Sequence, residues 1–94
     1  IIVVRIVFDP AKSAVNIRDR ALAFEQAAEF DFNDALIAED VRHAYPERRF
    51  VAVGYLTNRL HVLCFALIGG GIRVISFRKA NAREGKAHEK PLYR

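Results

Sequence analysis

The chain of 94 residues contains no tryptophan and one cysteine, Cys64. A single cysteine cannot form an intramolecular disulfide, and the sequence has neither a Cys-X-X-Cys pair nor a Cys/His cluster that would indicate zinc. We therefore expect a reducing, cytoplasmic location, no bound metal and no cofactor. Because Cys64 lies in an apolar run, which disfavours the reactive thiolate, we interpret it as a core residue and not as a nucleophile.

Long apolar runs are also missing. No stretch approaches the roughly 20 apolar residues that span a bilayer, so we expect no contact with a membrane. The apolar share is nevertheless 52%, and in the absence of tryptophan the seven phenylalanines are the large core candidates. The charged share of 28% is ordinary for a folded chain, and the length predicts a single domain over residues 1–94.

Positive charge is unevenly distributed along the chain. Residues 73–94 contain seven Lys or Arg and two Glu, a net charge of +5, whereas the residues before them carry eight positive and nine negative charges, a net charge of −1. Residues 25–40 contain six acidic side chains and no basic one. This asymmetry is typical of a phosphate-binding face opposite an acidic edge, although solvated surface charge explains any single Lys or Arg equally well.

Turn and capping signals divide the chain into short elements. Asp9-Pro10 is a helix start, and Asn81 followed by Glu84 resembles a capping box. Tight connections at residues 57–59 and 69–71 join β-rich runs and predict an antiparallel meander. We expect an α+β domain in the order β-α-α-β-β-β-β-α, with two N-terminal helices and a C-terminal helix on a mostly antiparallel sheet. The expected strands are 3–8, 36–38, 50–55, 60–67 and 72–78, and the expected helices are 10–18, 24–32 and a last one between Asn81 and Pro91.

Several motifs resemble those of the BrnT family of toxins. The chain opens with Phe8-Asp9-Pro10-Ala11-Lys12 and Asn16, which resembles the family pattern F-D-x-x-K-x-x-x-N. Glu47-Arg48 followed by Gly54 resembles its E-R…G strand. Residues 72–80, Ile-Arg-Val-Ile-Ser-Phe-Arg-Lys-Ala, followed by Glu84, resemble its closing signature I-R-I-I-S-A-R-K-A…E. The likeness runs in order from about Phe8 to Glu89.

The resemblance implies a RelE-like fold and a metal-independent endoribonuclease that inhibits translation and growth. It also implies a small antitoxin with a DNA-binding region, through which alone the toxin would meet DNA. One departure concerns residues 19–21, where the family's Lys-His-Gly triplet is replaced by Asp19-Arg20-Ala21. Arg20 cannot replace that histidine as a base, because a guanidinium stays protonated.

Cleavage of RNA without a metal needs positive charge at the phosphate, which arginine supplies through paired N–H groups. We expect Arg48, Arg78 and Lys79 to gather around one phosphate, with Arg78 on the face of Ile72 and Val74 and Arg73 on the opposite face. The predicted catalytic residues are Lys12, Arg48 and Arg78, and the predicted RNA-binding residues are Arg20, Tyr55, Arg73 and Lys79.

The general base is left open by the sequence. A histidine is the natural choice because its charge changes near neutral pH. The candidates are His43, His61, His88 and Glu47, with Tyr55 as a possible proton donor. Each also has a structural interpretation: an outward sheet position for His61, a solvated helix for His88, a loop for His43 and a surface charge for Glu47.

Two other functions compete with the ribonuclease. The chain could be a catalytically impaired homologue that serves only as the binding partner of a DNA-binding antitoxin in a repressor complex. It could also be a basic nucleic-acid-binding domain outside any toxin system. Growth arrest with RNA cleavage would separate the first from the ribonuclease, and co-purification with a neighbouring gene product would count against the second.

Overall fold

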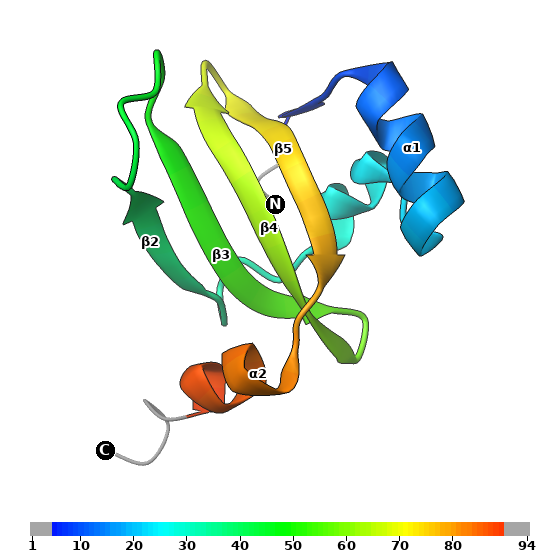
Figure 1. The fold of residues 1–94 in the computed structure, drawn as a ribbon, viewed down its shortest axis with the longest axis vertical. Helices are drawn as coiled ribbons and strands as arrows, with labels where there is room; N and C mark the ends of the chain where they lie inside the picture. The colour runs from blue at the N-terminus through cyan, green and yellow to red at the C-terminus, as the bar shows by residue number, and fades with distance from the viewer. Residues whose placement is uncertain (1–4, 90–94) are drawn as a thin grey trace.

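The computed structural model describes residues 5–89, which form a five-stranded sheet flanked by helices (Figure 1). The order across the sheet is β1-β5-β4-β3-β2, and every neighbouring pair is antiparallel except β1 and β5. The prediction of an α+β fold on a mostly antiparallel sheet is confirmed. In chain order the elements are β1 (Arg5–Val7), α1 (Pro10–Arg20), the 3₁₀ helix η1 (Phe24–Glu29), β2 (Leu36–Asp40), β3 (Arg49–Leu56), β4 (Arg59–Ile68), β5 (Gly71–Lys79) and α2 (Ala82–Glu89).

Two predicted boundaries, the strand start at Val3 and the helix stop at Pro91, lie outside the described residues. Within residues 5–89, no helix is both long and apolar enough to cross a bilayer.

Helix α1 begins as its sequence predicts. Asp9 is the N-cap, its Oδ1 accepts a hydrogen bond from the Ala11 backbone at 2.9 Å, and Pro10 occupies the first turn. The helix ends at Ala21, which adopts a left-handed conformation with φ 54°. Its buried side chains, Ser13 and Asn16, are polar, so α1 is held to the rest of the protein mainly by hydrogen bonds.

The second helix is shorter and tighter than predicted. The sequence predicts an α-helix over residues 24–32, whereas η1 is a 3₁₀ helix that ends at Glu29. Ala23 has no side-chain oxygen for a cap, and the segment closes with i+3 bonds such as Phe30 N to Ala27 O at 3.2 Å. Phe30 is already extended and bridges Leu56, and Phe32 also packs against the core. Burial of these rings therefore overrides the helical pattern.

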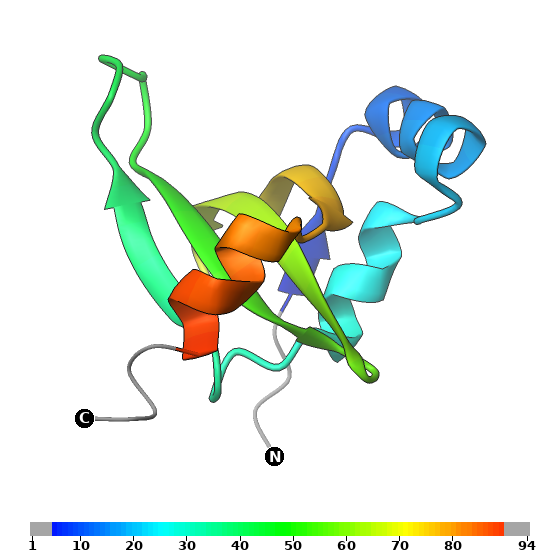
Figure 2. The same cartoon turned by 60° about the horizontal axis from the view of Figure 1, so that its bottom comes forward.

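The sheet has two different faces (Figure 2). The side that we call the core face carries Leu63 and Phe77, both 0% exposed, and packs against η1 through buried Phe24 and Phe30. The side that we call the α2 face lies under the C-terminal helix, where the His88 ring meets Tyr55 edge-on at 5.6 Å. Cys64 lies on the α2 face and is only half-buried, so its assignment to the core is wrong.

A β-bulge in β5 changes which face each late side chain occupies. Cys64 pairs with Ser76 but Phe65 pairs with Val74, so Ile75 is an extra residue. The alternation shifts by one position there. As a result Arg73 and Arg78 share the α2 face, while Ile72 and Val74 point into the core. The predicted sharing of faces is therefore wrong, because strict alternation along β5 does not account for the bulge.

Candidate nucleic-acid interface

A basic hollow lies where α1 ends beside the end of β5. Its volume is about 530 Å³, and we call it the β5-end hollow. Asn16 fixes this arrangement, because its Nδ2 donates to Leu22 O and to Phe77 O, both at 2.9 Å. The hollow is lined by four cationic side chains, one acidic side chain and two apolar residues: Arg18, Arg20, Arg78, Lys79, Asp19, Ala21 and Leu22.

The positive charges in this hollow are only partly compensated. Arg18 pairs with Asp19 at 3.0 Å, but both are largely exposed and such a pair is weak. Arg20 donates to the neutral Asn16 Oδ1 at 3.2 Å. Within the part of the chain that the structure describes, neither Arg20 nor Lys79 has a carboxylate partner. The two side chains therefore present unneutralised charge to an incoming anion.

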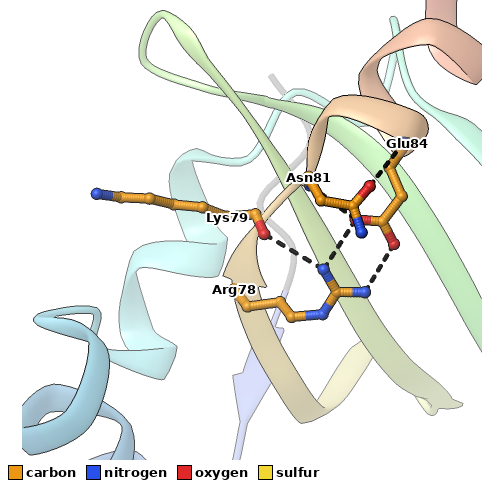
Figure 3. A network of polar contacts seen from close by, with 4 residues as sticks. All are labelled: Arg78, Lys79, Asn81 and Glu84. Carbon is orange, nitrogen blue, oxygen red and sulfur yellow. Dashed lines mark hydrogen bonds and ion pairs between the residues drawn. The ribbon is translucent and has the colours of Figure 1, made fainter.

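Arg78 is held in a fixed orientation by α2 (Figure 3). Its Nη1 and Nη2 donate to the two carboxylate oxygens of Glu84 at 2.8 and 2.7 Å, and Nη1 also donates to Lys79 O at 3.3 Å. Glu84 is itself fixed by a reciprocal capping box with Asn81, at 2.9 Å in each direction. The hydrogen bonds from Arg78 are the main cause that lowers the pKa of Glu84 to about 2, so Glu84 is ionised near neutral pH.

The bond count leaves one edge of Arg78 open. A guanidinium has five N–H donors, and three are used by Glu84 and Lys79. Among the described residues, Nε–H and the second Nη2–H have no acceptor. These two adjacent groups form the same edge that Arg48 uses to bind Glu39, through Nε at 3.0 Å and Nη2 at 2.9 Å. Arg78 can thus bind a phosphate in bidentate fashion while it remains paired with Glu84.

Arg48 lies far from this site. It precedes β3 and forms an ion pair with Glu39, whose pKa it lowers through their hydrogen bonds, and its guanidinium lies 5.3 Å from the Phe50 ring centroid. Arg78 pairs with Val62 of β4, whereas Arg49, the first residue of β3, pairs with Ala66 of β4. Val62 and Ala66 are four residues, or about 13 Å, apart along the strand. The prediction that Arg48 gathers with Arg78 and Lys79 is therefore wrong.

Arg73, Lys12 and Tyr55 also lie outside the β5-end hollow. Arg73 forms an ion pair with Glu47 near the start of β3, in a group that includes Arg49 stacked over Tyr45 at 4.1 Å. Lys12 is exposed in the first turns of α1, eight residues or about 12 Å before Arg20. Tyr55 packs against His88. Of the seven predicted site residues, the hollow brings together Arg20, Arg78 and Lys79.

The four candidate bases occupy different places. His61 is 5% exposed on the core face, so the outward position considered from the sequence is wrong, and its register partner is Lys79. His88 is also buried, not solvated, and its Nε2 donates to Asp34 O at 2.8 Å. His43 is exposed in the β2–β3 loop beside Tyr45, and Glu47 is paired with Arg73. Only His61 therefore neighbours a residue of the hollow.

Three contributors to the hollow, Arg18, Asn16 and Glu84, were not among the predicted site residues. Arg18 lines the hollow, but nothing in its sequence context distinguishes it from an ordinary helix charge. Asn16 and Glu84 support the hollow, and both belong to the motifs that resemble the toxin family, although the sequence assigned them no role. Among the described residues, no three His, Cys, Asp or Glu side chains are grouped in a way that would hold a metal ion.

A basic hollow built by a helix end and a strand end is suited to a protein that binds anionic polymers. Residues 8–84 match the family model described as "Ribonuclease toxin, BrnT, of type II toxin-antitoxin system". The match covers more than half of the chain, so the chain belongs to this family. A cognate antitoxin is therefore a partner of this chain. No curated protein matches the sequence.

Proposed function

We propose that the chain is a metal-independent endoribonuclease that cleaves cellular RNA, inhibits translation and growth, and holds the scissile phosphate in the β5-end hollow. The observations that carry this proposal are that Arg20, Arg78 and Lys79 all line one hollow and that Arg78 keeps one guanidinium edge open. Lys79 and Arg78 leave β5 in opposite directions, Lys79 on the core face and Arg78 toward α2 (Figure 3). Membership of a ribonuclease toxin family supports the proposal. The predicted roles of Lys12 and Arg48 in catalysis, and of Arg73 and Tyr55 in RNA binding, are not part of this proposal.

The chemistry follows from these groups. A 2′-hydroxyl gives its proton to a base and attacks the adjacent phosphorus, and the bond to the 5′-oxygen breaks as that oxygen takes a proton from a water molecule. The products are a 2′,3′-cyclic phosphate and a 5′-hydroxyl. Charge that develops on the phosphorane oxygens is stabilised by the open edge of Arg78 and by the ammonium of Lys79, whose exposed side chain turns from the core face toward the phosphate at the end of β5. Arg20 binds the flanking backbone phosphate.

His61 is the base in this scheme. Its Nδ1 lies 2.8 Å from Arg59 O, and because a carbonyl oxygen only accepts, Nδ1 carries the proton. The neutral ring therefore has its free lone pair on Nε2. His61 pairs with Lys79 across the sheet on the same face, so among the four candidate bases it is the one whose register partner lines the hollow. Because residues 19–21 are Asp-Arg-Ala and contain no histidine, this scheme takes its base from outside α1.

The partners follow from the same proposal. An antitoxin with a DNA-binding region neutralises the toxin, and DNA is reached only through that antitoxin. The fold, with two helices between β1 and β2 and a short helix after β5, supports the RelE-like classification.

Replacing single residues of the hollow by alanine tests the proposal. We expect Arg20→Ala and Lys79→Ala to slow cleavage of a defined single-stranded RNA by about tenfold or more, because each removes one phosphate contact. His61→Ala should slow it by about 10²–10⁴-fold, as expected for the loss of a general base. Initial rates are measured in EDTA, with His61→Gln as a second variant if the alanine variant is unstable.

Arg42→Ala is the matched control. Arg42 is also an exposed arginine, but it pairs with Asp40 at 2.9 Å in the β2–β3 region, away from the hollow. Its removal changes the net charge equally and should leave the rate within about twofold. If Arg42→Ala slows cleavage as much as Lys79→Ala, general charge and not the hollow is responsible. If the wild type binds its antitoxin but cleaves no RNA, the chain is the impaired homologue.

A further inference from the structure

The core face is left partly uncovered by the described helices. Beyond η1, toward the β2–β3 loop and the β4–β5 turn, it forms a hollow of about 290 Å³ that we call the apolar hollow. Its lining is entirely apolar and comes from four strands and the segment before β2: Phe32, Ile37, Phe50, Phe65, Leu67 and Ile72. Leu67 is 58% exposed and Ile37 is 47% exposed. Contiguous apolar surface of this kind marks a site of protein contact.

The apolar hollow and the β5-end hollow involve opposite ends of β5, which Figure 1 shows at opposite ends of the sheet. On β5 the first contains Ile72 near the strand start, whereas the second contains Lys79 at the strand end. Between them, η1 covers the core face through Phe24 and Phe30. A protein bound at the apolar hollow therefore does not need to touch the residues that we assign to RNA.

One ion pair borders the apolar hollow on the β3 side. Arg48 neutralises Glu39 and stacks on Phe50, so this pair forms the rim of the hollow. Asp31 and Asp34 lie at the other end of β3, because Asp31 N donates to Tyr55 O and Asp34 O accepts from His88. A partner at this hollow therefore makes a mainly apolar contact, with the Arg48–Glu39 pair at its edge.

We propose that the apolar hollow docks an amphipathic helix of the cognate antitoxin, whose apolar side chains fill the cavity beside Leu67 and whose polar side chains meet the Arg48–Glu39 pair at the rim. The partner is the antitoxin because the chain belongs to a toxin–antitoxin family. A helix suits the shape of the hollow, because the lining residues come from four neighbouring strands. A strand added at the edge of the sheet would contact only the outermost of these strands. The use of RNA cleavage as a readout rests on the proposed function.

Leu67→Asp and Ile37→Asp test this docking site. Each puts a charge into the apolar contact and should weaken binding of the purified antitoxin, the small protein encoded beside the toxin, by at least about 30-fold in calorimetry. Cleavage of RNA by the free variants should stay within about twofold of wild type. Because Leu67 is more than half exposed, the fold should tolerate the change, and Leu67→Ala provides a milder variant with an expected loss of about tenfold.

Val41→Asp is the control, because Val41 is an apolar residue of the β2–β3 loop, 78% exposed, outside the lining. It should leave antitoxin binding unchanged. If all variants bind the antitoxin equally well, the docking site is wrong. It is also wrong if Leu67→Asp abolishes a toxin dimer in light scattering but leaves antitoxin binding intact, because the hollow would then bind a second copy of the chain. If wild type cleaves no RNA while Leu67→Asp still weakens antitoxin binding, the docking site stands and the ribonuclease proposal fails.

Discussion

Arg78→Lys is expected to reduce the rate of RNA cleavage by about 10²–10³-fold, although the charge at this position is kept. Lysine has no planar fork, so it cannot bind Glu84 and a phosphate at the same time through two separate edges. The guanidinium of Arg78 makes three hydrogen bonds within the protein and still offers two adjacent N–H groups. Single-turnover rates at saturating protein, measured with wild type and variant, give the comparison.

Glu84→Gln separates the role of the open edge from that of the ion pair. This variant removes the charge of Glu84 but leaves Arg78 with its full set of donors. We expect a loss of less than about tenfold, because Arg78 loses part of its orientation but not its fork. If Glu84→Gln is as slow as Arg78→Lys, then the contribution of Arg78 consists of anchoring α2, and the phosphate contact assigned to it is wrong.

Phe77→Ala is expected to lower the free energy of unfolding by about 3–5 kcal/mol. Phe77 is 0% exposed, and its ring meets Phe30 edge-on at 6.2 Å and lies 5.6 Å from His61. In a chain of this size such a loss is a large part of the total stability. Urea unfolding followed by circular dichroism measures it, and Leu67→Ala, at an exposed position, should change the value by only about 0.5 kcal/mol. Equal losses for both would contradict the assignment of Phe77 to the core.

The fold was accessible from the sequence where local chemistry decides it. Asp9-Pro10 fixed the start of α1, and the short connections at residues 57–59 and 69–71 predicted the antiparallel meander that β3, β4 and β5 form. The prediction was wrong where tertiary packing decides. The helical pattern of residues 24–32 ends in a 3₁₀ helix because Phe30 and Phe32 pack into the core from extended backbone.

The candidate site was less accessible, and two features explain why. The bulge at Ile75 reverses the alternation of β5, and nothing in the residue types around it predicts an extra residue. The sequence analysis placed Arg48 near Arg78 because both belong to neighbouring strands. Arg48 instead lies at the other end of the sheet, where it pairs with Glu39. Arg20 and Lys79, by contrast, meet because Asn16 ties the end of α1 to Phe77.

Analysis of the RNA ends made by the purified chain in EDTA tests the account most directly. With a scissile phosphate held by Arg78 and Lys79 and a base that removes the 2′-hydroxyl proton, every cut should leave a 2′,3′-cyclic phosphate and a 5′-hydroxyl, and chelation should not slow the reaction. Products with a 5′-phosphate, or cleavage that stops in EDTA and returns with added Mg²⁺, would contradict it.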